Sequence, residues 1–238
     1  VNSKKTKLAL YDKLIFATGS YPAMTSVPFD KKSKLYFLKS MDDAIKTDEF
    51  LKTAKNIAVI GGGMTGVEVA RIAQERGIQT TLIHRNKNLL NDYLDEPASH
   101  LLESWMNAEG TRLLLNTEVT EIGFDEENTI IQTANGQKIP VDGVIFTIGF
   151  RPNSYLLNQQ VELGDSGAVI VDEYMQTSCP DVFAVGDVST TYVNLLEKSY
   201  YLPHASDAVR DGEIAAINLL APRQKINSSQ GTYHVPMK

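Results

Sequence analysis

Cysteine is nearly missing from this 238-residue sequence, since Cys179 is the only one. A single cysteine excludes an internal disulfide and a redox-active cysteine pair within the chain. No apolar run approaches the ~20 residues that cross a bilayer, and no signal peptide is visible. A cytoplasmic location and no membrane partner are therefore expected. The formal net charge of −6 argues against nucleic acid as a general partner.

Glycine, in contrast, is concentrated in one informative stretch. Residues 56–60 form an apolar run rich in β-branched residues, which is typical of a buried parallel strand. Gly61, Gly63 and Gly66 follow with the spacing G-x-G-x-x-G, and good helix formers continue to residue 76. A second apolar run at 79–84 closes a βαβ unit within ~30 residues. A glycine turn without a ligand is the alternative reading, but this context favours a dinucleotide site.

Each glycine of the motif has its own expected task. Gly61 permits the tight turn, Gly63 lets a pyrophosphate approach the backbone, and Gly66 lets the helix pack close to the strand. The free N–H groups and the positive dipole end of the helix then face the phosphates.

The flanking sequence predicts the rest of an α/β domain at 40–148. Helices are expected at 44–52 and at 96–108, the latter opened by Pro97. Alternating residues at 119–124 and 129–133 predict an antiparallel hairpin, the start of a meander. A helix at 205–220 is expected to bury an apolar face, whose members are Ala208, Val209, Ile214, Ala215 and Ile217. Buried strands at 14–17 and 144–149 each end in a glycine turn, as if one nucleotide-binding fold interrupted another.

Four ordered motifs resemble one protein family, the pyridine nucleotide–disulfide oxidoreductases. They are 11–20 (YDKLIFATGS), the glycine motif at 61–66, 149–153 (GFRPN) and 180–187 (PDVFAVGD). Within the family the chain is most similar to the branch of NADH oxidases, NADH peroxidases and coenzyme A-disulfide reductases. The resemblance implies a Rossmann-like α/β fold with a parallel sheet, central helices and a three-stranded antiparallel meander. It further implies an FAD-binding domain at 1–39 and 149–222, an inserted NAD(P)-binding domain at 40–148, and the start of a dimerisation domain at 223–238.

The activity that the resemblance implies is FAD-dependent oxidation of NAD(P)H. Hydride would pass from nicotinamide to FAD, and the electrons would continue to a small-molecule acceptor, namely oxygen, peroxide or a disulfide. The family's N-terminal FAD motif and its redox cysteine have no counterpart here, so we expect a fragment of a longer, homodimeric enzyme. Two alternatives stay open: a catalytically silent NAD(P)-binding fragment, and a ferredoxin-reductase-type flavoprotein that uses no cysteine.

The same resemblance assigns the FAD contacts. Asp187, after Gly186, would bond the ribityl chain, and a carboxylate at a strand end can accept such hydroxyls. Thr18 and Gly19 would contact the adenosine side through the backbone, and Gly149 belongs to a further cofactor-binding turn. Plain strand-end turns, with an aspartate bonded to its own backbone, are the alternative explanation.

Two residues after the second strand bear on the choice of nicotinamide cofactor. An NAD site usually has Asp or Glu ~20 residues after the glycines, to hold the ribose 2′-hydroxyl. His84 and Arg85 stand there instead. An arginine binds a 2′-phosphate through a fork of donors, which favours NADPH. Gly66 favours NADH, because NADPH sites of the family often carry alanine there, and a solvated loop is the third possibility.

Four other residues received a role from the resemblance or from chemistry. Glu68 is the candidate catalytic residue, a carboxylate directed at the flavin and nicotinamide, although a carboxylate near a helix N-terminus is also favourable by itself. Met64 replaces the aromatic residue that often gates the nicotinamide pocket. Cys179 is interpreted as structural, and His204 is only a weak acid–base candidate. No metal site is expected.

Overall fold

The computed structural model describes residues 9–23, 26–157, 159–193, 198–220 and 225. The chain forms two compact units, of which one combines Val1–Tyr21 with Phe150–Lys238 and the other is Pro22–Gly149. The sequence places these divisions at 39/40 and 148/149, so the first observed break comes earlier in the chain. The assignment of one cofactor to each unit stays a prediction.

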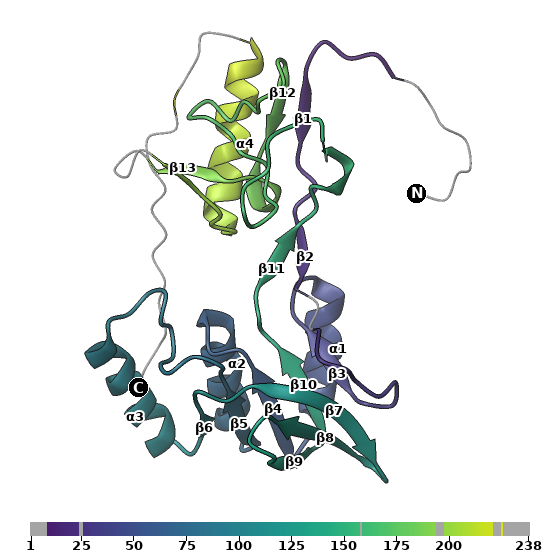
Figure 1. Cartoon of the computed structure of the whole chain (residues 1–238), viewed down its shortest axis with the longest axis vertical. Coiled ribbons are helices and arrows are strands. Elements are labelled where there is room, and N and C mark those ends of the chain that lie inside the picture. Colours follow the sequence, from purple (N-terminus) through teal and green to yellow (C-terminus); the bar gives the residue numbers. More distant parts are fainter. Residues whose placement is uncertain (1–8, 24–25, 158, 194–197, 221–224, 226–238) are drawn as a thin grey trace. The chain divides into compact units, whose positions relative to one another are not determined.

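A five-stranded, wholly parallel sheet forms the centre of the unit Pro22–Gly149 (Figure 1). Its strands, in spatial order, are β3 (Leu35–Phe37), β10 (Gly143–Phe146), β4 (Asn56–Ile60), β5 (Gln79–Ile83) and β6 (Arg112–Leu114). Strand β3 was not predicted. It reaches the sheet from a segment that looks like a loop, because three residues are too few to show a periodicity.

Three helices pack against this sheet, and their caps can be recognised in the sequence. They are α1 (Met41–Leu51), α2 (Met64–Glu75) and α3 (Glu96–Ala108). Ser40 and Asp43 form a reciprocal capping box at the start of α1. The side chain of Asp95 caps α3, and a proline occupies its first turn, as predicted. Helix α2 packs on β4 and β5, while α1 lies by β3 and α3 by β6.

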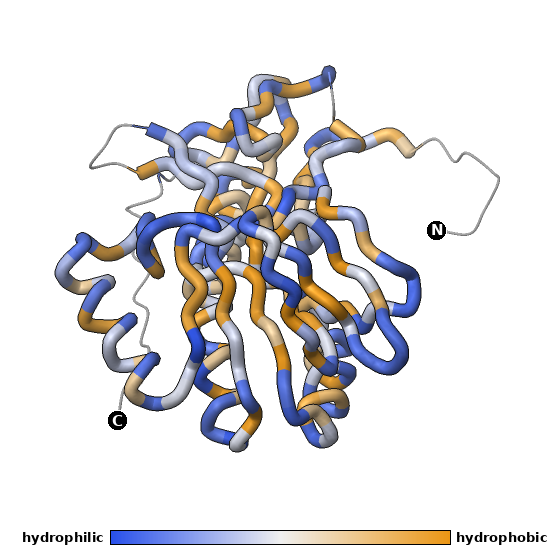
Figure 2. Tube along the Cα trace, turned by 60° about the horizontal axis from the view of Figure 1, so that its bottom comes forward, coloured by the Kyte–Doolittle hydropathy of each residue, from blue (hydrophilic) through white to orange (hydrophobic). Residues whose placement is uncertain are grey.

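An antiparallel meander packs on the sheet through a shared apolar cluster. Its strands are β7 (Val119–Asp125), β8 (Asn128–Thr133) and β9 (Lys138–Val141), which confirms the predicted hairpin. Ile122 and Ile131 of the meander belong to one cluster with Ala58 and Phe146 of the sheet. On β3, Tyr36 stacks with Phe50 of α1, whereas Phe37 stacks with Phe146 in that cluster. Because neighbouring strand residues face opposite sides, the sheet lies between a helical layer and the meander. Figure 2 shows the strands as hydrophobic stretches with hydrophilic segments at their ends.

The other unit is built around one parallel strand pair and a long helix. Strand β1 (Leu14–Phe16) pairs with β12 (Val182–Ala184), and α4 covers Ala205–Leu220. Further pairs are β2 (Ser20–Pro22) with β11 (Phe150–Pro152) and β13 (Thr191–Val193) with β14 (Lys198–Tyr200). Two short 3₁₀ helices, η1 (Tyr155–Leu157) and η2 (Gly186–Val188), complete the elements. Phe16, Phe183, Met175 and Ile214 share its core cluster.

The buried face of α4 differs from the predicted one. Val209 is 65% exposed and Ile217 39% exposed, so two of the five expected apolar positions face solvent. The buried residues are Asp207, Asp211, Ile214, Ala215 and Asn218. Two of the polar members have protein partners: Asp207 pairs with Arg210, and Asn218 donates to the carbonyl of Tyr174. Helical spacing alone could not decide between two overlapping faces of the helix, the predicted apolar face and the observed buried face, which is partly polar.

The predicted α/β class, with its parallel sheet and antiparallel meander, is confirmed. Among the residues that the structure describes, no helix is both long and apolar enough to traverse a bilayer. The expected start of a dimerisation domain at 223–238 lies outside the described residues, apart from Lys225.

Candidate nucleotide-binding site

The glycine motif lies at the carboxyl edge of the five-stranded sheet. Gly61 follows β4, His84 follows β5 and Thr147 follows β10, and these three strands are neighbours. Since all of them are parallel, the loops that follow them meet at one edge. Ligands of open α/β sheets bind at that edge.

The geometry explains why two of the three glycines are needed. Gly61 has φ +119°, and a Cβ there would lie 2.5 Å from the carbonyl oxygen of Thr147. A Cβ on Gly66 would lie 1.8 Å from the carbonyl oxygen of Gly61. The Thr147 hydroxyl, which sequence reasoning missed, donates to the carbonyl oxygens of Ile60 and Gly61 at 3.1 and 3.0 Å. Gly61, Gly66 and Thr147 thus form a tightly packed turn.

Gly63 is different, because a Cβ there would meet nothing within 4 Å. It is the N-cap of α2, and no side chain caps this end of the helix. The first turn of α2 also contains no acidic residue. The N–H groups at the start of α2 thus have no side-chain cap, and there is open space beside Gly63, an arrangement that suits phosphate groups.

His84 lies under the turn and contacts it directly. The N–H of Gly62 donates to His84 Nδ1 at 3.0 Å, and His84 Nε2 lies 3.2 Å from Oδ1 of Asn91. A Cβ on Gly62 would lie 2.6 Å from the His84 ring. The imidazole therefore packs against the glycine loop with both of its nitrogens engaged.

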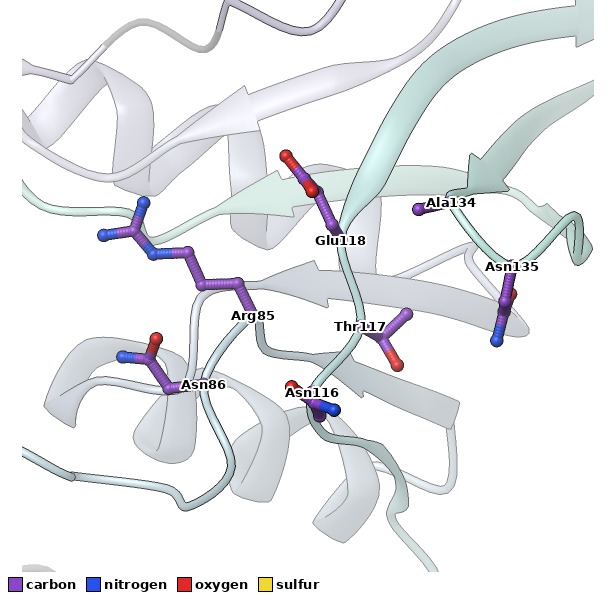
Figure 3. Close-up of a pocket in the computed structure, with 7 residues that line it drawn as sticks. All are labelled: Arg85, Asn86, Asn116, Thr117, Glu118, Ala134 and Asn135. Atoms are coloured by element: carbon purple, nitrogen blue, oxygen red, sulfur yellow. The ribbon is translucent and has the colours of Figure 1, made fainter.

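Arg85 is exposed and lines a cavity of about 420 Å³ (Figure 3). The cavity is lined by Arg85, Asn86, Asn116, Thr117, Glu118, Ala134 and Asn135. In Figure 3 the Arg85 side chain extends away from Asn116 and Asn135. Its guanidinium is thus available at the end of β5, the strand after the glycine helix.

Glu68 and Met64 both lie on α2 and are half-buried. Met64 is the first helical residue, next to the open position at Gly63, and Glu68 is one turn further along. Their predicted roles toward flavin and nicotinamide stay predictions.

A second strand edge carries four of the residues predicted to contact FAD, namely Thr18, Gly19, Gly186 and Asp187. Strands β1 and β12 are parallel, so the segments after Phe16 and after Ala184 leave the same edge. Thr18 and Asn153 exchange two hydrogen bonds: Thr18 Oγ1 donates to the Asn153 carbonyl at 2.8 Å, and Asn153 Nδ2 donates to the Thr18 carbonyl at 3.0 Å. Gly19 has φ +67°, and a Cβ there would meet nothing within 4 Å. Gly149 is equally open, with φ +95°, in the other unit.

Asp187 is fixed in η2 by a residue far away in sequence. Its Oδ2 accepts the hydroxyl of Ser20 at 2.8 Å, a pair that sequence reasoning missed. The preceding Gly186 has φ +69° and lies against Ala208 of α4. Burial, together with the Asp187 carboxylate, raises the pKa of Tyr201 to about 12. Asp187 is therefore held at the strand edge next to a neutral phenol.

Asp211 of α4 is the most unusual carboxyl group of this unit. It is 1% exposed, and its Oδ1 has no hydrogen-bond partner. The backbone N–H of Gly186 and the hydroxyl of Thr191 partly lower the pKa of Asp211, but they do not outweigh its burial. Burial, the largest of several causes, raises the pKa of Asp211 to about 6. The four-residue spacing from Asp207 was the only sequence signal for it.

Cys179 and His204 both have local hydrogen bonds. The N–H of Cys179 donates to Thr177 Oγ1 at 3.1 Å, and His204 Nδ1 lies 2.7 Å from the Ser206 hydroxyl. Within the part of the chain that the structure describes, no group of three or more His, Cys, Asp or Glu residues could hold a metal ion.

The family model described as "Pyridine nucleotide-disulphide oxidoreductase" matches residues 1–212. The chain belongs to this family. The resemblance inferred from four motifs is thereby confirmed.

Several named relatives of the chain are NADH oxidases, and others are nitrite reductases. The NADH oxidase of Enterococcus faecalis is 36% identical over 228 residues, covering 95% of this chain and 51% of the relative. The structure of a water-forming NADH oxidase from Lactobacillus brevis, bound to NADH, matches with a TM-score of 0.87 and 33% identity, covering 90% of this chain and 48% of the other. The chain thus spans about half the length of these relatives.

An engineered form of the Lactobacillus brevis enzyme also matches, with TM-score 0.87 and 33% identity, over 90% of this chain and 48% of the other. It is described as a water-forming NADPH oxidase bound to NADPH. Five residues were changed in it: glycine to alanine, aspartate to alanine, alanine to arginine, methionine to serine and proline to arginine. The last four lie 18, 19, 20 and 25 residues after the glycine.

Proposed function

We propose that this protein binds NAD(P)H at the glycine turn and takes part in FAD-dependent oxidation of the nicotinamide. The observation that carries the proposal is the uncapped N-terminus of α2 with open space at Gly63. A pyrophosphate has both room and N–H donors there. The membership in the family supports FAD as the second cofactor.

The residues of the chain bind and orient, whereas the cofactors supply the chemistry. Bound FAD and NAD(P)H would supply hydride transfer from nicotinamide to flavin. Gly61, Gly66 and Thr147 keep the turn compact, and the N–H groups at the start of α2 would hold the phosphates. In the other unit, Asp187 would accept hydroxyl groups of the ribityl chain, and its bond from Ser20 holds the carboxylate in place. We therefore assign FAD to the unit that contains Asp187, and NAD(P)H to Pro22–Gly149.

For the nicotinamide cofactor we propose NADPH, with Arg85 as the residue that binds the 2′-phosphate. Counted from Gly66, the four spacings of the engineered NADPH oxidase lead to His84, Arg85, Asn86 and Asn91. The chain thus has no aspartate where the NADH-bound parent has one, and has arginine where the NADPH-bound variant has arginine. Gly66 and the name NADH oxidase favour NADH instead. The arginine has the more direct mechanism, since its fork of donors matches a phosphate.

We further propose that the electrons pass to a small-molecule acceptor, with the whole enzyme acting as a homodimer. The relatives' names support oxygen as one such acceptor, since the Lactobacillus brevis enzyme is called water-forming. Peroxide and disulfides are the other members of the predicted set.

Titration of the protein with NADPH and with NADH, followed by calorimetry, tests the nucleotide site. We expect both to bind, and NADPH to bind more tightly. Tighter binding of NADH would overturn the assignment of Arg85 alone. If neither nucleotide bound, the glycine turn would be merely structural.

A further inference from the structure

His84 connects the glycine turn to the loop that follows β5. Because Nδ1 accepts the N–H of Gly62, the proton of the neutral imidazole must be on Nε2. Nε2 then donates to Oδ1 of Asn91, which also accepts from Asn86 Nδ2 at 2.9 Å. The ring thus forms a bridge between a backbone donor and a side-chain acceptor.

Gly62 is held from both sides by this arrangement. Its N–H bonds to His84, and its carbonyl accepts the N–H of Leu90 at 2.9 Å. The loop is itself anchored, because the N–H of Leu89 donates to Glu103 of α3 at 2.9 Å and Leu89 is fully buried. Gly62 immediately precedes the open N-cap of α2. Any movement of Gly62 would therefore move the N–H groups proposed to hold a pyrophosphate.

We propose that His84 is a positioning residue for the nucleotide: its neutral imidazole fixes the glycine turn and does not bind the ribose. The inference rests on the proposed nucleotide site. In the NADH-bound relative an aspartate stands at this spacing from the glycine. Here the side chain is turned to the protein, with both nitrogens engaged. The pyrophosphate is common to NADH and NADPH, so His84 supports the binding of both equally.

Two variants separate the two ring nitrogens. In His84→Asn, the amide oxygen can occupy the place of Nδ1 and still accept the N–H of Gly62. In His84→Gln, the amide reaches the place of Nε2, and the Gly62 bond is lost. We expect His84→Gln to raise the Kd of both nucleotides about tenfold, the size of effect of one buried hydrogen bond. His84→Asn should stay within about threefold of the wild type, since that bond is retained.

The outcomes separate this inference from the proposed function. If the wild type binds neither nucleotide, the proposed function fails. Two outcomes would overturn only the inference about His84, provided that the wild type binds both nucleotides. In one, His84→Gln binds both nucleotides as tightly as the wild type; in the other, His84→Asn is as impaired in binding as His84→Gln. If His84→Gln lost affinity for NADPH alone, His84 would bind the 2′-phosphate, and the inference would be overturned as well.

A third variant covers the case in which His84→Gln does not fold, as judged by its melting temperature. Asn91→Ala removes the partner of Nε2 and leaves the imidazole in place. We expect Asn91→Ala to raise the Kd of NADH and of NADPH by the same factor, and this factor should be smaller than that of His84→Gln. An Asn91→Ala protein with unchanged affinity for both would contradict the bridge.

Discussion

The carbonyl oxygen of Gly61 points at Gly66, and a Cβ on Gly66 would lie only 1.8 Å from it. The atoms in the way are backbone atoms of the turn, which cannot rotate aside as a flexible side chain does. This contact fixes how closely α2 can approach the end of β4. It also separates the two functions of the glycine motif, compact folding and room for a ligand.

Gly66→Ala is expected to destabilise the fold. Overpacking of a closely packed site costs roughly 1–3 kcal/mol, and the backbone around Gly61 must shift to admit the methyl group. The free energy of unfolding, measured by urea denaturation, should fall by about 2 kcal/mol. The glycine and the aspartate that were changed in the engineered NADPH oxidase are 18 residues apart, as Gly66 and His84 are here. Unchanged stability of Gly66→Ala would show that the turn relaxes easily.

Gly63→Ala should impair nucleotide binding more than stability. The new Cβ meets nothing within 4 Å, so no clash is expected, and the loss of stability should be limited to about 0.5–1 kcal/mol, because alanine is a poorer N-cap than glycine. The methyl group occupies the space through which a pyrophosphate reaches the backbone. We expect the Kd of NADH and NADPH to rise at least about tenfold, a loss that matches one or two hydrogen bonds. Unimpaired binding would place the phosphates elsewhere.

Arg85→Ala tests the choice of cofactor. A charge-assisted bond to phosphate contributes roughly 1.5–3 kcal/mol, so the Kd of NADPH should rise about 10- to 100-fold, while that of NADH stays unchanged. High salt should reduce the difference, because the arginine is exposed. Arg112→Ala is the matched control, since this exposed arginine begins β6 at the amino edge of the sheet. Equal weakening of NADH by Arg85→Ala would contradict a role at the 2′-phosphate.

Asp211 should make stability depend on pH. Its pKa is raised from 3.8 to about 6, so between these values the folded state binds more protons than the unfolded state. Its contribution to stability is therefore fully present below pH 4 and is lost as the pH rises through 6. Asp211→Asn keeps the size and shape of the side chain and removes the charge. At pH 7.5 it should be more stable than the wild type, by up to about 3 kcal/mol.

Chemical denaturation of both proteins at pH 4.5 and pH 7.5 measures this effect. The difference between Asp211→Asn and the wild type should be larger at the higher pH. Asp207→Asn is the control, because Asp207 pairs with Arg210 and its replacement should destabilise the protein. A difference for Asp211→Asn that does not change with pH would show that Asp211 is not the titrating group.

Most of the fold could be predicted from local signals in the sequence. The glycine spacing marked β4, α2 and β5, and Pro97 marked the start of α3, because these residues impose a conformation on their own segment. Strand β3 and the buried face of α4 depend instead on distant partners, β10 and η2, which no local pattern encodes.

The candidate site divides in the same way. The turn at 61–66 could be located from its glycines alone, since each occupies a position of the motif that requires a residue without a Cβ. The placement of His84 could not, because it depends on which neighbour its nitrogens meet, and the sequence indicates only its distance from the glycines. Thr147 bonds to Gly61, 86 residues before it, and Ser20 bonds to Asp187, 167 residues after it. Such distant contacts are beyond the reach of any sequence pattern.

The most direct test of the account is the visible absorption spectrum of the protein with added FAD, recorded without oxygen before and after addition of NADPH or NADH. We predict a flavin band that either nucleotide bleaches, with NADPH the faster, because we propose that the glycine turn binds the nicotinamide cofactor and that Asp187 binds FAD. A flavin band that neither nucleotide bleaches would contradict the proposed oxidation of NAD(P)H. Absence of a flavin band, with NAD(P)H still bound, would reduce the protein to a silent nucleotide-binding chain.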